Sequence, residues 1–307
     1  MKSYIIGIDG GGTKTLGVLF DIEGKEVARA TSGFANMNVD ELGSIKSIKE
    51  VLEELVNLAH DGLIETVQIG IAGYSNYTKK EQFKEDLSNY TDAMIDIMTD
   101  AEIALYSVKR DSDKNVIMIL GGTGSVVMVD KDDKIKYIGG FGHLLGDEGS
   151  GYHLAITALK GIIEQFESGK EISDLSWKIL NEIKALEYDD IKKFVYNNKK
   201  SQIAKLSEFI AKEAQKSDQE AKNLFINEGL LLAEQAMKAY KYLGKKQEVL
   251  IGFRGGFLLN APYVKDALLN ALSSQNIDYI LDDSYLEPVY GSYYRGFKQL
   301  KKRWKNG

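Results

Sequence analysis

Two segments of the chain repeat one arrangement of residues. In the first, an apolar run ends at Asp9 and leads into Gly10-Gly11-Gly12-Thr13-Lys14; in the second, a run ends at Leu120 and leads into Gly121-Gly122-Thr123-Gly124-Ser125. Glycines allow positive φ and close approach to a ligand, and successive N–H groups in such a turn form an anion-binding concavity. Either turn alone could be a plain hairpin. The repetition favours two cradles that face each other and clamp a polyphosphate.

Asp9 ends the first run, directly beside the proposed phosphate turn. A carboxylate there is costly unless a cation lies between it and the phosphate. Mg²⁺ keeps several waters and takes few carboxylates, so Asp9 is the candidate metal ligand. The alternative is that Asp9 caps its own turn. The turn is neither a Walker P-loop, because Thr13 stands between Gly12 and Lys14, nor a dinucleotide fingerprint, because a second strand follows.

Asp100 lies where a strand ends and a helix begins, in Met98-Thr99-Asp100-Ala101-Glu102. Strand ends of this kind form the ligand crevice of an α/β sheet. A helix cap would also explain an aspartate there, and the two roles need not exclude each other. Phosphorylation of a sugar hydroxyl requires a carboxylate that orients the hydroxyl and accepts its proton.

The segment from Gly139 to Gly151 contains six glycines in thirteen residues. Phe141 could stack on the face of a sugar, and Asp147 or Glu148 could bind hydroxyls. A helix start would explain the acidic residues through the helix dipole, but not the glycines. Two weaker signals are Asn36, whose amide can bind hydroxyls or form a turn, and Gly255-Gly256, which suits an adenosine or a plain helix entry.

The elements that must position these residues follow from periodicity. Strand-like runs and helical stretches in the first third have the order β-β-β-α-β-α-β, which indicates a meander followed by crossover helices. A helix is expected at 41–59 and another from Thr78, where Thr78-Lys79-Lys80-Glu81 has capping-box spacing. The chain from Asp147 to Lys241 is almost wholly helical in pattern. The expected strands are 4–9, 16–20, 26–31, 66–72, 94–98, 116–120, 126–130, 135–138, 249–253 and 279–281.

Composition limits the function classes. A chain of 307 residues is long enough for two domains, with a boundary expected in the polar stretch 109–115. The net charge of −6 makes a nucleic-acid partner unexpected. The absence of cysteine excludes disulfides, iron–sulfur clusters and cysteine nucleophiles. No apolar run approaches the roughly 20 residues of a membrane span, and no leader peptide is evident. We expect a cytoplasmic protein without a membrane partner.

With these motifs in order along the chain, the sequence resembles the BadF/BadG/BcrA/BcrD-type ATPase family, which contains N-acetylglucosamine kinases, within the sugar kinase/Hsp70/actin superfamily. The resemblance implies an α/β protein with two duplicated RNase H-like (actin-like ATPase) domains around a central cleft that holds ATP. It implies an N-terminal domain over 1–112, onto which a helix at 292–307 packs, and a C-terminal domain over 113–291 with a helical insertion. A homodimer is permitted.

The resemblance also assigns roles to residues. Asp100 is the base for the sugar 6-hydroxyl and Asp9 faces Mg²⁺. Phosphate contacts fall on Gly11, Gly12, Thr13, Lys14, Gly122, Thr123, Gly124 and Ser125, and adenosine contacts on Gly255 and Gly256. Sugar contacts fall on Asn36, Asp100, Thr123, Gly140, Phe141 and Asp147. Relatives carry tryptophan at the position of Phe141, which leaves the sugar open.

The expected activity is ATP-dependent phosphorylation of an N-acetylated amino sugar, either N-acetylglucosamine or N-acetylmuramic acid. Two alternatives remain: an ATPase that activates a partner protein without a sugar substrate, and a non-catalytic sugar sensor. The first would normally carry cysteines that hold an iron–sulfur cluster, and this chain has none. The second would be expected to lack Asp9 or Asp100, and both are present.

Overall fold

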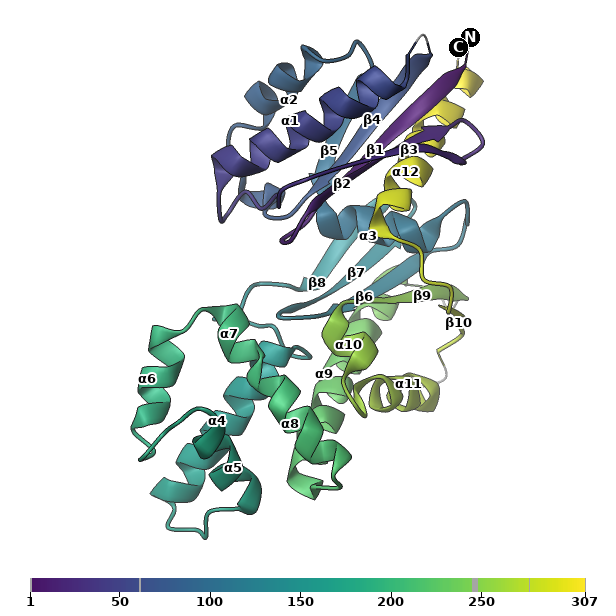
Figure 1. Cartoon of the computed structure of the whole chain (residues 1–307). Coiled ribbons are helices and arrows are strands. Elements are labelled where there is room, and N and C mark those ends of the chain that lie inside the picture. Colours follow the sequence, from purple (N-terminus) through teal and green to yellow (C-terminus); the bar gives the residue numbers. More distant parts are fainter. Residues whose placement is uncertain (1, 61, 245–247, 276, 307) are drawn as a thin grey trace. The chain divides into compact units, whose positions relative to one another are not determined.

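The computed structural model describes residues 2–60, 62–244, 248–275 and 277–306. The chain divides into two compact units, the first Met1–Lys114 with Asp283–Gly307 and the second Asn115–Asp282. Each unit contains a five-stranded mixed sheet (Figure 1).

The first sheet has the strand order β3-β2-β1-β4-β5. Strands β1, β2 and β3 form an antiparallel meander, and β4 and β5 run parallel to β1. The bounds are β1 (Ser3–Gly10), β2 (Thr15–Asp21), β3 (Glu26–Ser32), α1 (Glu41–Leu58), β4 (Leu63–Ile71), η1 (Tyr74–Asn76), α2 (Lys80–Ser88), β5 (Met94–Thr99), α3 (Asp100–Lys109) and α12 (Pro288–Asn306).

The alternation of side chains along β1 explains how helices cover both faces of this sheet. Ile6 and Ile8 pack into a core with α1, whereas Ile5 packs with Val289 and Tyr293 of α12. In Figure 1, α1 crosses one face of the sheet and α12 lies on the other. The terminal helix begins at Pro288, earlier than the predicted start at residue 292, and proline suits the first turn of a helix.

One local prediction in this unit is wrong. Helix α2 begins at Lys80, and its N-cap residue is Lys79, which makes no side-chain capping bond. The capping box predicted at Thr78 is therefore not formed. A capping box does form at the start of α3, between Thr99 and Glu102.

The second sheet has the strand order β10-β9-β6-β7-β8. Read from the other edge, this order reproduces that of the first sheet, with β6 in the place of β1 and β9 in the place of β4. The predicted duplication of one α/β fold is thus confirmed. The bounds are β6 (Val116–Gly121), β7 (Ser125–Lys131), β8 (Lys134–Gly139), α4 (Gly151–Glu167), α5 (Asp174–Glu182), α6 (Asp190–Asn197), α7 (Lys200–Ala204), α8 (Leu206–Gln215), α9 (Gln219–Leu243), β9 (Val249–Arg254), α10 (Gly256–Asn260), α11 (Val264–Ser274) and β10 (Tyr279–Asp282).

The helices α4 to α9 lie between β8 and β9 in the chain and form the predicted helical insertion. The first of them begins at Gly151, because Ser150 is the N-cap and accepts a hydrogen bond from the N–H of His153. Asp147 and Glu148 therefore precede the helix. The alternative in which these two acids form the first helical turn is not supported.

Candidate functional site

The parallel strands of the first sheet bring its predicted site residues to one edge. Gly10 pairs with Ile71, and Ile71 pairs with Thr99, so the carboxyl ends of β1, β4 and β5 lie on one rung. Asp9 is the residue before the last in β1, which leads into the first turn, and Asp100 directly follows β5. Residues far apart in sequence thus converge at the strand ends where α/β sheets bind ligands.

The first glycine-rich turn, for which phosphate contacts are predicted, is a tight hairpin closed by Gly10 and Thr15. The N–H of Gly11 donates to the carbonyl of Lys14 at 3.1 Å. Within the part of the chain that the structure describes, the N–H groups of Gly12 and Thr13 donate to no backbone carbonyl. Neither Gly11 nor Gly12 has a positive φ. The expectation that these glycines adopt a positive φ is wrong for this turn.

What the turn offers instead is open space. A Cβ placed on Gly12 would meet no atom within 4 Å, and one on Gly11 would meet only the Lys14 carbonyl at 3.7 Å. Neither backbone conformation nor packing within the protein demands glycine at position 12. The bare, exposed backbone is what an anion needs in order to approach two free N–H groups.

The second turn is a similar hairpin that is one residue shorter, with three residues between its closing pair where the first turn has four. Gly121 pairs with Ser125, and the N–H of Gly122 donates to the Gly124 carbonyl at 2.8 Å. Thr123 at its tip is exposed. The hydroxyl of Ser125 is used within the protein, because it donates to the Glu148 carbonyl at 2.7 Å. Among the predicted phosphate contacts of this turn, Thr123 is therefore open to a ligand, whereas the buried Ser125 side chain holds a loop.

Asp9 and Asp100 form the charged part of the first site. The pKa of Asp9 is raised from 3.8 to about 7, mainly by burial and in addition by the nearby charge of Asp100, while Lys14 opposes the shift. Burial likewise raises the pKa of Asp100, against hydrogen bonds from backbone N–H groups at the start of α3. Two half-buried carboxyl groups with raised pKa values are characteristic of functional sites.

Asp100 does not serve as the helix cap. The cap is Thr99, whose Oγ1 accepts a hydrogen bond from the N–H of Glu102 at 3.1 Å. The Glu102 side chain accepts one from the N–H of Thr99 at 2.8 Å. Asp100 is the first residue within α3, so the capping explanation for this aspartate is wrong.

Asp9 suits a magnesium ion that is shared with a nucleotide. No group of three or more His, Cys, Asp or Glu side chains that could hold a metal occurs in the described part of the chain. Mg²⁺ is commonly held by one or two carboxylates together with substrate phosphates and water. Burial and the neighbouring Asp100 disfavour the ionised form of Asp9 more than Lys14 favours it, and a divalent cation bound there would favour the ionised form.

Asn36 lies at the same edge as the first turn. Its backbone bridges to Ala72, which follows β4, and the neighbouring Ala35 N–H donates to the Gly11 carbonyl at 2.9 Å. The side-chain Oδ1 of Asn36 accepts a hydrogen bond from the N–H of Asn38 at 3.0 Å. The predicted turn-forming role is thus present, and it fixes the amide beside the phosphate turn.

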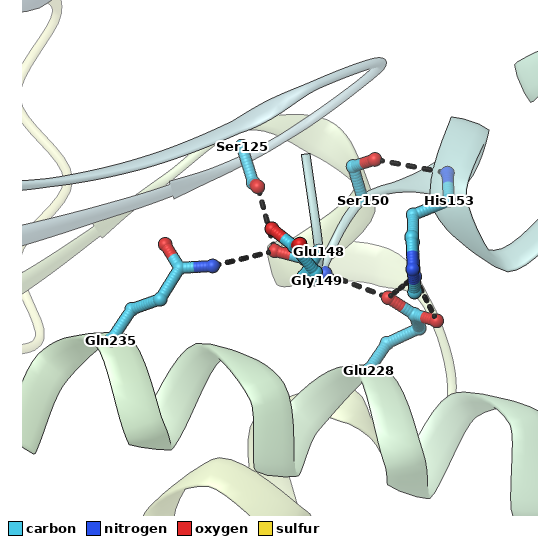
Figure 2. A network of polar contacts seen from close by, with 7 residues as sticks. All are labelled: Ser125, Glu148, Gly149, Ser150, His153, Glu228 and Gln235. Carbon is cyan, nitrogen blue, oxygen red and sulfur yellow. Dashed lines mark hydrogen bonds and ion pairs between the residues drawn. The ribbon is translucent and has the colours of Figure 1, made fainter. Parts of the chain in front are cut away.

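Polar contacts from helix α9 hold the glycine-rich loop of the second unit (Figure 2). The carboxylate of Glu228 accepts a hydrogen bond from the N–H of Gly149 at 2.7 Å and contacts Nδ1 of His153 at 2.9 Å. The amide of Gln235 donates to the Glu148 carbonyl at 3.0 Å. Glu228 and Gln235 project from one face of α9 toward the loop, so the loop is fixed through its backbone.

This loop presents two of the predicted sugar-binding residues very differently. Phe141 is 73% exposed and is available for stacking, next to Gly140, whose φ of +74° requires glycine. Asp147 is 3% exposed and has a φ of +69°. Its carboxylate lies 2.5 Å from Nζ of Lys200, the first residue of α7. Sequence reasoning missed Lys200, Glu228 and Gln235, because no local motif marks them.

The two glycines of the Gly255–Gly256 pair have different roles: the first is required by packing, and the second lines a pocket. Gly255 has a φ of +92°, and a Cβ there would lie 2.4 Å from the Gly121 carbonyl, so close packing of two strand ends requires glycine. Gly256 lines a pocket of about 700 Å³, a size typical of ligand sites. The pocket is lined by Gly122, Thr123, Gly151, Ser201, Ala204, Lys205, Ser207, Glu208, Ala211, Lys212, Gln215, Phe225, Gly256, Phe257, Asn260 and Ala261.

This pocket adjoins the second glycine-rich turn through Gly122 and Thr123, and its other lining residues come mainly from α7, α8 and α10, with Phe225 from α9. Phe225 and Phe257, which line it, stack with ring centroids 6.0 Å apart. An apolar wall, several polar groups and an adjacent anion cradle together suit a nucleoside with a phosphate tail.

A duplicated β-β-β-α-β-α-β arrangement with a glycine-rich turn in each half is the fold of actin-like ATPase domains. The chain belongs to the BadF/BadG/BcrA/BcrD ATPase family, whose model matches residues 6–293. The family resemblance seen in the sequence is thereby confirmed.

Two proteins of known activity are similar to this chain over most of their length. The chain is 29% identical over 279 residues to the N-acetylmuramic acid/N-acetylglucosamine kinase of Clostridium acetobutylicum, covering 86% of this chain and 88% of that protein. It is 25% identical over 287 residues to the N-acetyl-D-glucosamine kinase of Dictyostelium discoideum, covering 87% of this chain and 89% of that protein.

A solved structure shares the fold. A candidate N-acetylglucosamine kinase from Chromobacterium violaceum matches with a TM-score of 0.68 at 20% identity, over 96% of this chain and 98% of that one.

No helix in the described ranges is both long enough and apolar enough to cross a membrane.

Proposed function

We propose that this protein transfers the γ-phosphoryl group of ATP to the 6-hydroxyl of an N-acetylated amino sugar, either N-acetylglucosamine or N-acetylmuramic acid. The observation that carries the proposal is the position of Asp100. It begins a helix at the strand edge that also bears Asp9 and the first turn, and another residue caps that helix. The names of the two curated relatives support the same activity.

In the proposed reaction, Asp100 accepts the proton of the sugar hydroxyl as the oxygen attacks the γ-phosphorus. The bond from that phosphorus to the β–γ bridging oxygen breaks, and ADP leaves. Positioning and charge stabilisation supply most of the catalysis in phosphoryl transfer. The first turn (Gly11 to Lys14) and the second turn (Gly122 to Ser125) bind the phosphates, and Asp9 would hold Mg²⁺, which would offset their charge.

The remaining contacts are assigned by the same proposal. The pocket at Gly256 takes the nucleoside, and Gly255, packed against Gly121, precedes it in the chain. Asn36, Thr123, Gly140, Phe141 and Asp147 contact the sugar. Each compact unit is taken as one domain, with α12 counted as part of the first.

The test is a coupled-enzyme screen of amino sugars with Mg-ATP, with N-acetylglucosamine, N-acetylmuramic acid, glucosamine and glucose as acceptors. We expect ADP release that depends on an N-acetylated sugar and a product phosphorylated at carbon 6, identified by phosphorus-coupled NMR. ATP hydrolysis that no sugar changes would favour a partner-activating ATPase. Sugar binding without any turnover would favour a sensor.

A further inference from the structure

An ion pair between a buried aspartate and a partly exposed lysine joins the glycine-rich loop to the helical insertion. Nζ of Lys200 lies 2.5 Å from Oδ2 of Asp147. The Asp147 side chain is 4% exposed, whereas that of Lys200 is 32% exposed. The contact is close but poorly directed, because Asp147 Oδ2 makes no hydrogen bond in the described part of the chain. A buried acceptor without a directed hydrogen bond is costly.

The pair lies directly against the second phosphate turn. A Cβ placed on Gly124 would come within 2.7 Å of Lys200 Nζ and within 2.9 Å of Asp147 Oδ1. The N–H of Ser125 also donates to Asp147 Oδ1 at 3.3 Å. A carboxylate therefore occupies the anion side of this turn and is neutralised by one lysine.

A phosphate at this turn would change the balance of charge. It would lie beside both Asp147, which repels it, and Lys200, which attracts it. Lysine is a flexible cation that commonly binds phosphate as a point charge. A phosphate carries more negative charge than one carboxylate, and Lys200 is the exposed partner that can turn toward it.

We infer that Lys200 couples nucleotide binding to sugar binding, which rests on the proposed function. In the free protein Lys200 covers Asp147 Oδ2. When a nucleotide phosphate occupies the second turn, Lys200 moves to the phosphate, and Asp147 Oδ2 becomes free to accept a hydrogen bond from a sugar hydroxyl. Lys200 is thus a positioning residue that acts on the sugar through Asp147.

The coupling has a measurable sign. Because linkage is reciprocal, bound nucleotide must raise sugar affinity by the same factor as bound sugar raises nucleotide affinity. Replacement of Lys200 by methionine keeps the length of the side chain but removes its charge. It should weaken nucleotide binding, strengthen sugar binding in the absence of nucleotide, and abolish the coupling.

The test is calorimetric titration of the full chain with N-acetylglucosamine and with Mg-ADP, each alone and in the presence of the other. For the natural protein we expect each ligand to raise the affinity of the other about fivefold or more. For Lys200→Met we expect about tenfold weaker Mg-ADP binding, tighter sugar binding without nucleotide, and no coupling. Lys200→Arg should retain the coupling.

Lys199→Met is the matched control. It removes the same charge one residue earlier, from an exposed side chain, and should behave like the natural protein. Asp147→Asn should weaken sugar binding whether or not nucleotide is present. If Lys200→Met keeps the coupling, or binds sugar more weakly without nucleotide, then Lys200 has only a structural role and the inference is wrong; continued sugar phosphorylation would leave the proposed function intact. A natural protein that binds neither ligand would overturn the proposed function itself.

Discussion

Thr99 and Glu102 cap one another at the start of α3. The hydroxyl oxygen of Thr99 accepts a hydrogen bond from the N–H of Glu102 at 3.1 Å, and the Glu102 carboxylate accepts one from the N–H of Thr99 at 2.8 Å. Together they satisfy two of the N–H groups that a helix start leaves without partners. Asp100, between them, is not the N-cap residue, and its carboxylate, which accepts hydrogen bonds from backbone N–H groups at the start of α3, is the proposed base.

Asp100→Asn should therefore remove activity without removing the fold. General-base catalysis contributes about 10²–10⁴-fold to rate, so we expect kcat to fall by about that factor. The affinity for Mg-ADP should change by less than about threefold, because Asp100 contacts the sugar hydroxyl and not the nucleotide in the proposed reaction. Steady-state kinetics and calorimetric titration measure the two quantities.

Thr99→Ala is the control for this variant. It removes the cap and should cost about 1 kcal/mol in the free energy of unfolding, measured by urea denaturation, while Asp100 remains in place. Near-normal kcat in Asp100→Asn would contradict the assigned role of the base.

Gly12→Ala should weaken nucleotide binding and leave stability almost unchanged. The new Cβ would meet no protein atom within 4 Å, and the backbone is not in the left-handed region. The free energy of unfolding should shift by no more than about 0.5 kcal/mol. The methyl group would occupy the space required by the phosphate, so Mg-ADP affinity should fall about tenfold or more.

Gly17→Ala provides the contrast. Its Cβ would lie 2.3 Å from Val51 and 2.7 Å from Leu55 in the core. Overpacking of this kind costs about 1–3 kcal/mol, and the molecules that fold should bind Mg-ADP normally. Loss of stability in Gly12→Ala equal to that in Gly17→Ala would show that glycine 12 serves packing and not a ligand.

The fold could be predicted from the sequence because its signals are local and occur twice. Buried strands such as Ile5 to Asp9 and Val116 to Leu120 are continuous apolar runs, and each leads into a glycine-rich turn. The order of these runs along the chain determines the sheet topology. The start of α2 was misplaced because Thr78 and Glu81 match a capping box in spacing, but the helix begins two residues after Thr78.

The site could be predicted only where its residues lie in motifs. Asp9 and Asp100 stand at strand ends, and Phe141 stands in a glycine-rich loop. Lys200 and Glu228 lie on helices of the insertion, among many other charged residues of similar local sequence. Only tertiary packing brings them to the second turn and its loop.

Magnesium binding should depend on pH through Asp9. In the metal-free protein its pKa is raised from 3.8 to about 7, first by burial and then by the charge of Asp100. Mg²⁺ binds the ionised carboxylate, so its affinity should fall about tenfold for each pH unit below 7. Calorimetry of Mg-ADP binding at pH 6 and pH 8, in buffers of different ionisation enthalpy, should reveal proton release at the lower pH.

Asp9→Asn isolates this effect. The variant should bind Mg-ADP weakly and with little dependence on pH. A carboxyl with a raised pKa favours the folded state below its unfolded pKa, and this contribution is lost as pH rises through 7. The metal-free natural protein should therefore lose stability relative to Asp9→Asn between pH 5 and pH 8. Parallel stability curves for the two proteins would contradict a raised pKa.

The contact between Glu228 and His153 should make the stability of the second unit depend on pH in a defined direction. The hydrogen bond to Glu228 raises the pKa of His153 above its ordinary value of 6.5, against the effect of burial, with Glu148 adding to the rise and Lys160 opposing it. A raised histidine pKa contributes stability that is complete below pH 6.5 and is lost as pH rises through the folded-state value.

Glu228→Gln removes the buried charge but keeps an oxygen that can accept from the N–H of Gly149. The loss of a hydrogen bond to a charged group costs about 1.5–3 kcal/mol, and we expect this loss in urea denaturation at pH 5.5 and a smaller loss at pH 9. His153→Gln should show little difference between the two pH values. An equal loss of stability at pH 5.5 and pH 9 for Glu228→Gln would mean that the charge on His153 contributes nothing. Glu228 would then stabilise the loop only through its hydrogen bond with Gly149.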